Sequence, residues 1–143
     1  MHVISLQTSE SPSLAIELPL KIKLLGGLHP FMCERFTLSA ETECPPFLRM
    51  DAEGEDLAFH LVDPFLVLPG YEPELSTEDD HELDLRGPGE AMLLSLVNLS
   101  RGAPAATLNL AAPIVVNMRT KAGKQAVLHN ASAYSVRHPL LAP

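Results

Sequence analysis

The stretch TLNLAAPIVVNMRTKAGKQAVLHN, residues 107–130, decides how this chain is expected to fold. In two runs, IVVNMR and QAVLH, every second residue is apolar and the residues between them form a mixed set that includes Asn117, Arg119 and Gln125; the five residues TKAGK separate the two runs. Alternation with a period of two is typical of a strand that buries one face. Glycine adopts positive φ without strain, so a short turn that contains Gly123 joins such strands readily. The stretch therefore predicts a terminal hairpin with Gly123 in its turn.

The two faces of this hairpin differ in chemistry. One face is apolar and is expected to pack in the core. The other face carries what we call the amide ladder, which comprises Asn109, Asn117, Arg119 and Gln125, with Val115 and Val127 among them. Neutral hydrogen-bonding groups lose less than charges when they leave water, so such a face suits contact with another protein. The alternative is an ordinary strand face that meets only solvent.

Short strand signals recur along the rest of the chain. The segments LKIKL, RFTLSA, PPFLRM, DLAFHLV and EAMLLSLVN each have an alternating or a continuously apolar pattern. The loop DAEGED joins two of them as a hairpin, and GGLHP ends another. Thirteen prolines and no tryptophan favour many short elements over long helices. We expect about nine strands in an all-β, mainly antiparallel, barrel-like fold.

The chain is expected to form a single domain, residues 1–143, with one short helix. A length of 143 residues is enough for one unaided hydrophobic core. The helix is predicted in STEDDHELDL, where Ser76 or Thr77 can cap the free backbone amides. Its first turn holds Glu78, Asp79 and Asp80, and the helix dipole favours negative charge there.

The segment DPFLVLPG, residues 63–70, has too many prolines for a regular helix or a central strand. We expect it to cross the core as an ordered segment. Its apolar side chains, Phe65, Leu66 and Leu68, are expected to anchor it.

Charge is distributed unevenly along the chain, whose net charge is −8. Residues 41–90 hold fifteen acids and two bases, whereas residues 91–143 hold five bases and no acid. An acidic chain is repelled by nucleic acid and by anionic membranes, so neither is expected as a direct partner. The acidic middle of the chain instead suits a basic protein partner.

The sequence motifs do not indicate an enzyme, a metal site or a cofactor. The histidines lack HxH and HExxH spacing, GxSxG is absent, and EDDHELD lacks the glycine and the final glutamate of a calcium loop. His60 and Asp63 are three residues apart, so they would point to opposite faces of a strand, which leaves a hydrolase as a minor alternative. Cys33 and Cys44 lack CxxC spacing and are expected to be reduced thiols of a cytoplasmic protein.

Three blocks of the sequence resemble the flagellar assembly factor FliW family. They are PPFLRMDAEGEDLAFHLVDPFLVLPGYEPELS, TLNLAAPIVVNMRTKAGKQAVL and YSVRHPLL, and their order and spacing agree from about Phe36 to Leu141. One departure is the turn GLHPF, residues 27–31, where members of the family usually carry GLPGF. The resemblance implies a small β-barrel-like fold and a partner switch. Members of this family bind the basic RNA-binding regulator CsrA, which relieves repression of flagellin mRNA, and they also bind flagellin.

Two surfaces are expected to carry this function. The acidic segment, residues 72–84, would steer basic CsrA toward the chain and raise the association rate. Its expected partner-binding residues are Glu72, Glu74, Glu78, Asp79 and Asp80. The amide ladder would supply short-range contacts. An alternative of another class is a small-molecule-binding barrel of lipocalin type, which would need a hollow interior.

Overall fold

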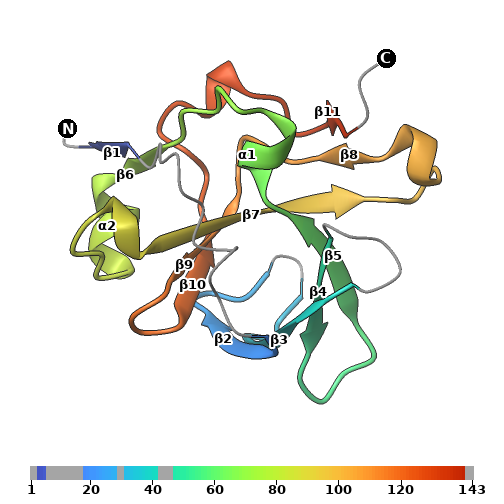
Figure 1. The fold of residues 1–143 in the computed structure, drawn as a ribbon. Helices are drawn as coiled ribbons and strands as arrows, with labels where there is room; N and C mark the ends of the chain where they lie inside the picture. The colour runs from blue at the N-terminus through green and yellow to red at the C-terminus, as the bar shows by residue number, and fades with distance from the viewer. Residues whose placement is uncertain (1–2, 6–17, 29–30, 42–46, 141–143) are drawn as a thin grey trace.

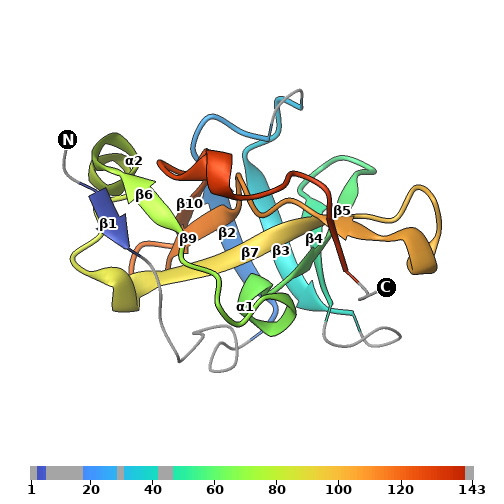
Figure 2. The same ribbon diagram turned by 90° about the horizontal axis from the view of Figure 1, so that it is seen from above.

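The described part of the chain forms a seven-stranded barrel with further strands and short helices packed against it (Figures 1 and 2). The structure is a computed structural model that describes residues 3–5, 18–28, 31–41 and 47–140. In order around the ring, the barrel strands are β7 (Ala91–Asn98), β5 (Ala58–Val62), β4 (Leu48–Ala52), β3 (Arg35–Ala40), β2 (Leu20–Leu24), β10 (Ala122–Gln125) and β9 (Ile114–Asn117). Strand β9 then pairs with β7, which closes the ring.

The barrel is mixed because one of its pairings is parallel. Strand β10 pairs in parallel with β2, with Ala122 opposite Lys23 and Gly123 opposite Leu24. The other six pairings of the ring are antiparallel. The prediction of an all-β, mainly antiparallel, barrel-like fold is therefore confirmed, with one parallel contact between an early strand and a late one.

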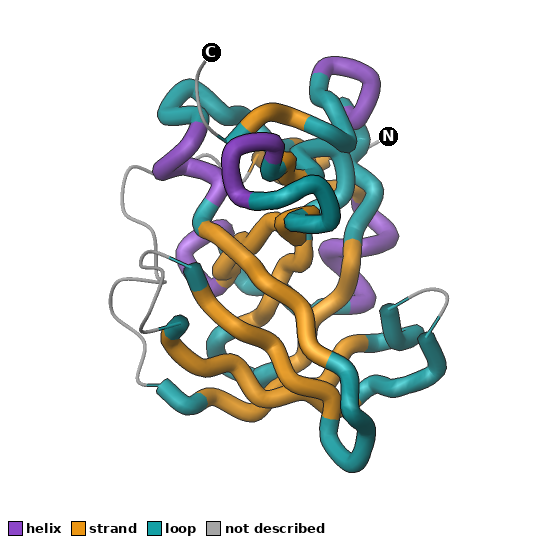
Figure 3. Tube along the Cα trace, turned by 90° about the vertical axis from the view of Figure 1, so that its right-hand side faces the viewer, coloured by secondary structure: helices purple, strands orange, loops and turns teal. Residues whose placement is uncertain are grey.

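Further elements surround the ring (Figure 3). The described residues add strands β1 (Val3–Ser5), β6 (Glu74–Ser76), β8 (Thr107–Leu108) and β11 (His138–Pro139), and helices α1 (Pro64–Val67) and α2 (Thr77–Glu82). They also contain 3-10 turns at Pro88–Glu90, Ala103–Ala105 and Ala131–Ala133. Strand β1 pairs with β6, whereas β8 and β11 extend the sheet from β7. The expected short helix is present as α2, and α1 is an addition.

Two apolar clusters, one inside the barrel and one outside it, hold these elements together. The interior cluster comprises Ile22, Leu24, Leu28, Phe36, Leu38, Met50, Ala52, Leu61, Met92, Leu94, Ile114 and Val116. The outer cluster comprises Val62, Tyr71, Leu75, Leu83, Ala91, Leu93, Leu108, Leu110, Val115, Ala126 and Leu128. Figure 1 shows the layer that covers the outer cluster: α1, β6 and the turn at residues 131–133 lie on one side of β7, opposite β2, β3 and β4.

Strand β9 is buried on both faces. Ile114 and Val116 join the interior cluster, Val115 joins the outer cluster, and Asn117 is 0% exposed. The expectation that this strand exposes one face is wrong, because a second layer of structure covers that face. A strand covered on both sides has the continuously apolar pattern seen in IVV.

The half-buried strands agree with their sequence patterns. Ile22 and Leu24 of β2 are buried, whereas the lysines between and beside them are exposed. In β3, Phe36 and Leu38 are buried as expected. Strands β4 and β5 form the expected hairpin, with Gly54 in its turn.

The segment at residues 63–70 contains a short helix that was not expected. Asp63 caps α1, because its Oδ1 accepts a hydrogen bond from the Phe65 N–H at 2.9 Å. Pro64 occupies the first helical position, where the missing N–H is not needed. Phe65 and Leu68 pack against the outer cluster as expected. Leu66 does not, since it is 53% exposed.

Gly123 lies inside β10 and not in the hairpin turn, so that expectation is wrong. The turn occupies residues 118–121, and Lys121 has the positive φ, 65°. A Cβ atom on Gly123 would lie 3.0 Å from Leu24 Cδ2 and 3.1 Å from the carbonyl oxygen of Val115. Glycine is needed here because two neighbouring strands approach closely, which is a common role of glycine within a sheet.

Candidate partner-binding surface

The acidic segment is built around α2, whose two ends are both capped. Ser76 Oγ accepts a hydrogen bond from the N–H of Asp79 at 3.1 Å, as expected for an N-cap. At the other end Asp84 adopts φ 52°, and the N–H of Leu85 donates to the Asp80 carbonyl at 3.2 Å. This arrangement is a Schellman motif. It ends the helix after six residues, before the expected stop at RGPG.

Lys124 of the terminal hairpin, β9 and β10, binds two acids of α2. Its Nζ lies 2.6 Å from Asp79 Oδ1 and 2.9 Å from Glu82 Oε2. Asp79 is only 8% exposed, so most of its charge is directed at Lys124. The hydrogen bond that Lys124 donates to Asp79, and then the one that it donates to Glu82, raise the pKa of Lys124 above its usual value of 10.5.

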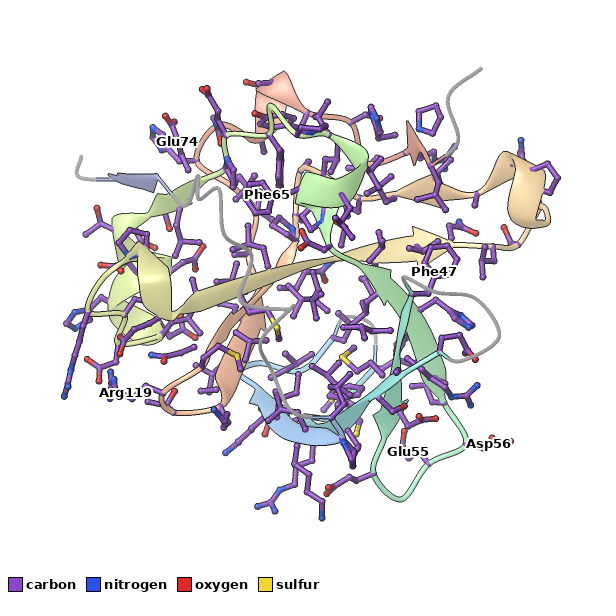
Figure 4. The ribbon with its side chains drawn as sticks, viewed as in Figure 1. Phe47, Glu55, Asp56, Phe65, Glu74 and Arg119 are labelled. Carbon is purple, nitrogen blue, oxygen red and sulfur yellow. The ribbon has the colours of Figure 1, made fainter. Side chains whose placement is uncertain are left out.

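Arg119 at the end of β9 holds the residues that follow α2. Its Nη2 donates to the carbonyl of Asp84 at 2.6 Å and lies 3.1 Å from Asp84 Oδ2. Its Nε lies 2.9 Å from Glu90 Oε2. The N–H of Arg86 and the side chain of Arg119 lower the pKa of Glu90 below 4.5. Figure 4 shows Arg119 below α2. The hairpin has no carboxylate near it in sequence, yet in space four carboxylates lie beside two of its cations, Arg119 and Lys124: those of Asp79, Glu82, Asp84 and Glu90.

Asn117 connects the same two elements from within the core. Its Nδ2 donates to the carbonyls of Leu83, at 2.8 Å, and Asp84, at 3.2 Å. Its Oδ1 accepts from the N–H groups of Arg119, at 2.8 Å, and Thr120, at 3.3 Å. All hydrogen-bonding groups of this buried amide are therefore used. The expectation that Asn117 faces outward is wrong, because α2 and its C-terminal turn cover it.

Asn109 and Gln125 form a separate pair around Ala112. Asn109 Oδ1 accepts from the N–H groups of Ala111 and Ala112, both at 3.0 Å. Gln125 Nε2 lies 3.4 Å from the carbonyl oxygen of Ala112. Both side chains are partly buried. The amide ladder thus divides into two groups, one at Ala112 and one at the end of α2, and does not form one continuous exposed face.

The remaining acids of the segment differ in exposure, and one oxygen of Asp80, Oδ1, is buried without a hydrogen bond in the described residues. Glu72 and Glu78 are exposed, and Glu74 and Asp80 are partly exposed. Among the described residues, none of these four makes an ion pair. The charges of Glu72 and Glu78 are therefore the most available to a partner, whereas that of Asp79 is used by Lys124.

The start of the acidic segment is held by two residues that the sequence analysis did not single out. The N–H of Glu72 donates to Tyr134 Oη at 2.8 Å, and the N–H of Glu74 donates to Asn130 Oδ1 at 3.0 Å. Asn130 Nδ2 donates back to the Glu72 carbonyl at 2.8 Å. Figure 4 shows Glu74 at one edge of the fold, and these hydrogen bonds hold that edge in place. A polar pair of this kind has no local signature, because Asn130 lies 56 residues from Glu74.

Tyr71 anchors this edge in the outer cluster. It is 0% exposed, and its Oη donates to the Leu110 carbonyl at 2.5 Å. Its ring meets the ring of Tyr134 edge to face, with centroids 4.8 Å apart. Burial raises the pKa of Tyr71 far above its usual value. The acidic segment is therefore fixed to the body of the protein at its start, middle and end.

The groups considered for chemistry are used elsewhere. His60 Nε2 lies 3.4 Å from Glu41 Oε2, whereas Asp63 caps α1. Cys33 is a free thiol whose Sγ lies 3.3 Å from the Arg35 carbonyl, and Cys44 lies outside the described residues. In the described ranges no group of three or more His, Cys, Asp or Glu side chains could hold a metal ion. No helix within those ranges is long and apolar enough to cross a membrane.

The barrel interior is filled by side chains. None of the twelve residues of the interior cluster is more than 5% exposed. Two hollows of about 230 and 240 Å³ open on the surface, and most of the residues that line them are polar or charged. This packing argues against a lipocalin-type site within the ring.

Comparison with known proteins identifies the family of this fold. The model of the FliW protein family matches residues 5–140. The chain belongs to the FliW family. A crystal structure described as the flagellar assembly factor FliW has the same fold, with a TM-score of 0.75 and 28% identity over 89% of both chains.

Relatives named flagellar assembly factor FliW occur in several bacteria. That of Natranaerobius thermophilus is 36% identical over 110 residues, which are 76% of this chain and 72% of the relative. That of Bacillus subtilis strain 168 is 31% identical over 117 residues, which are 80% of this chain and 81% of the relative. The resemblance seen in the three sequence blocks is thus confirmed. FliW proteins are assembly factors and not enzymes.

Proposed function

We propose that this FliW-family chain is a cytoplasmic partner switch that binds CsrA and flagellin. Binding to CsrA would relieve repression of flagellin mRNA, and flagellin would compete for the chain as it accumulates. The observation that carries the proposal is the family match over residues 5–140. The relatives' names place them in flagellar assembly. The choice of these two partners rests on the sequence resemblance.

The acidic segment supports the choice of a basic partner. Four of its acids make no ion pair within the described residues: Glu72, Glu74, Glu78 and Asp80. Exposed charges of one sign on a rigid edge raise the rate at which an oppositely charged protein associates. We assign the encounter with CsrA to these acids. Asp79 acts indirectly, since its ion pair with Lys124 holds α2 in place.

Asn117 and Arg119 of the amide ladder are assigned a positioning role in the same proposal. Their hydrogen bonds to the residues that follow α2 fix where its acids point. Asn109 and Gln125, which lie together at Ala112, remain proposed short-range contacts. Amide groups that are only partly buried can exchange their present hydrogen bonds for new ones with a partner.

The test measures association of the purified chain with purified CsrA, and separately with flagellin, over a range of salt concentrations. Reversal of charge in a Glu72→Lys, Glu78→Lys double variant is expected to lower the association rate with CsrA by about tenfold at low salt. The difference is expected to shrink as salt rises, because exposed charges more than about 10 Å apart are screened at 0.1 M.

The matched control is a Glu55→Lys, Asp56→Lys double variant. These two acids are exposed in the turn between β4 and β5, away from α2 (Figure 4). The control changes net charge by the same amount, so it is expected to retain most of the association rate. An equal loss in both variants, or an association that ignores salt, would contradict steering by the acidic segment. Absence of binding to both proteins at micromolar concentration would overturn the proposed function itself.

A further inference from the structure

The five bases of the acid-free C-terminal part of the chain fall into three groups by their contacts. Arg119 and Lys124 neutralise acids around α2. Lys121 directs its Nζ at the carbonyl of Met118. Within the described residues, the guanidinium groups of Arg101 and Arg137 make no hydrogen bond or ion pair. Of the five bases in this part of the chain, these two therefore have no internal side-chain partner among the described residues, although the chain is strongly acidic overall.

These two arginines line the same hollow. It has a volume of about 240 Å³ and is lined by Asn98, Ser100, Arg101, Ala105, Thr107 and Arg137. Asn98 and Thr107 are opposite each other on β7 and β8. Arg101 comes from the loop that joins those strands, and Arg137 immediately precedes β11, which pairs with β8. This end of β7 lies opposite the end that meets α2 (Figure 1).

The hollow presents donors and contains no carboxylate in its lining. Asn98 Oδ1 is already used, because it accepts from the N–H of Ser100 at 2.9 Å, which leaves its Nδ2 as a donor. The hydroxyl groups of Ser100 and Thr107 have no hydrogen bond within the described residues. By contrast, the hollow lined by Lys21, Arg35 and Lys121 also contains Glu53, which lies 3.9 Å from Lys21 Nζ.

We propose that the hollow between β7, β8 and β11 is a binding site for a small oxyanion, a phosphate group or a carboxylate. A guanidinium group presents a planar fork of donors that matches two oxygens of such an anion. Two of these groups, with the amide of Asn98 and the hydroxyl of Thr107 beside them, supply charge and orientation. The volume is below the range of about 300–1,000 Å³ typical of drug-sized ligands, so it suits a small group. This site is independent of the proposed function and lies away from the acidic segment.

The test is a titration of the full chain, labelled with nitrogen-15, with sodium phosphate and separately with sodium acetate at constant ionic strength. Amide signals of Ser100, Arg101 and Thr107 are expected to shift and to saturate at concentrations up to about 10 mM. Saturation by phosphate alone identifies a phosphate group as the ligand chemistry. Saturation by acetate identifies a carboxylate. Linear or scattered shifts with both anions overturn the proposal.

Three variants decide whether the two arginines are responsible. Arg101→Gln and Arg137→Gln are each expected to weaken anion binding by about tenfold, since each removes a charge-assisted hydrogen bond. Neither guanidinium group makes an internal hydrogen bond or ion pair with the described residues, so the spectra of the free variants should stay native. Arg35→Gln removes the same charge from the other hollow and is expected to leave binding unchanged. An equal loss in all three variants would show a general charge effect and would overturn the site.

Discussion

Replacement of Asn117 by alanine tests whether this residue is part of the structure or of a binding face. Its amide is fully buried and bridges β9 to the C-terminal turn of α2. The Asn117→Ala variant would leave the Leu83 carbonyl without its 2.8 Å donor and the Arg119 N–H without its 2.8 Å acceptor. The Leu83 carbonyl lies in a buried contact, and the Arg119 N–H lies in a partly buried one.

The expected loss follows from these two groups. Each buried polar group that loses its only partner costs about 1–3 kcal/mol. Two of them, with a small contribution from the weaker contacts to Asp84 and Thr120, give a loss of about 3 kcal/mol. For a domain of this size each kcal/mol lowers the melting temperature by about 4 °C, so Tm should fall by about 12 °C.

Urea unfolding and calorimetry of the pure protein measure this loss directly. An unchanged m value with a lower midpoint would show that stability has changed and that the unfolded state has not. The control is Asn98→Ala, which removes one hydrogen bond from an exposed amide and should cost less than about 1 kcal/mol. A loss for Asn117→Ala no larger than that of the control would refute the reasoning and would restore Asn117 as a surface residue.

Three further changes test the core and its charges. Gly123→Ala should destabilise the protein by about 1–3 kcal/mol through overpacking. The control is Gly70→Ala: Gly70 has open space around it, so this change should alter stability by less than about 0.5 kcal/mol in urea unfolding. Equal effects of the two variants would contradict the close approach of strands at Gly123. Tyr71→Phe should lower the free energy of unfolding by about 1–2 kcal/mol, because the Leu110 carbonyl loses its donor. Unchanged stability in the same assay would contradict this and would show that water replaces the hydroxyl. The pKa of Glu90 is lowered below 4.5 in the folded protein. The contribution of its carboxylate to the stability of the fold is therefore present above pH 4.5 and is lost as the pH falls through the lowered pKa. The stability difference between the wild type and Glu90→Gln should therefore shrink as unfolding is followed from pH 7 to pH 3, and a constant difference would exclude this linkage.

The sequence pattern predicts the half-buried strands well, because their burial depends only on alternation. Lys21 and Lys23 mark the outer face of β2, and Phe36 and Leu38 mark the inner face of β3, with no reference to the rest of the fold. The cap of α2 is equally local, since Ser76 binds an amide only three residues away. These features follow from the chain's immediate neighbours.

The features that the pattern misses depend on distant parts of the chain. Asn117 looks like a member of an exposed face until residues 83 and 84 cover it. The segment TKAGK around Gly123 has the composition of a turn. Only the close approach of Leu24 from β2 shows why a side chain is excluded at position 123. A polar residue can have the same sequence neighbours on a strand face that other elements cover and on one that is exposed to solvent. The pattern alone therefore cannot distinguish the two cases.

The candidate site shows the same division. The excess of acids in residues 72–84 is visible in the sequence, but which of them remain available is not. Lys124 and Arg119 select Asp79, Glu82 and Asp84 for internal ion pairs across 35 or more residues. The acids left over are therefore determined by tertiary structure.

The parallel pair between β2 and β10 has a consequence for synthesis of the chain. The pairing of Lys23 with Ala122 cannot form until Ala122 has been synthesised. At about 5–20 residues per second, a ribosome needs about 5–20 s to supply the intervening chain. During that interval one edge of β2 has no neighbour, and unpaired edges promote association between chains. Lys21 and Lys23 are exposed on this strand, and lysines on an edge discourage such association. The two lysines that face water in the folded barrel are thus also placed to discourage association of the incomplete chain during synthesis.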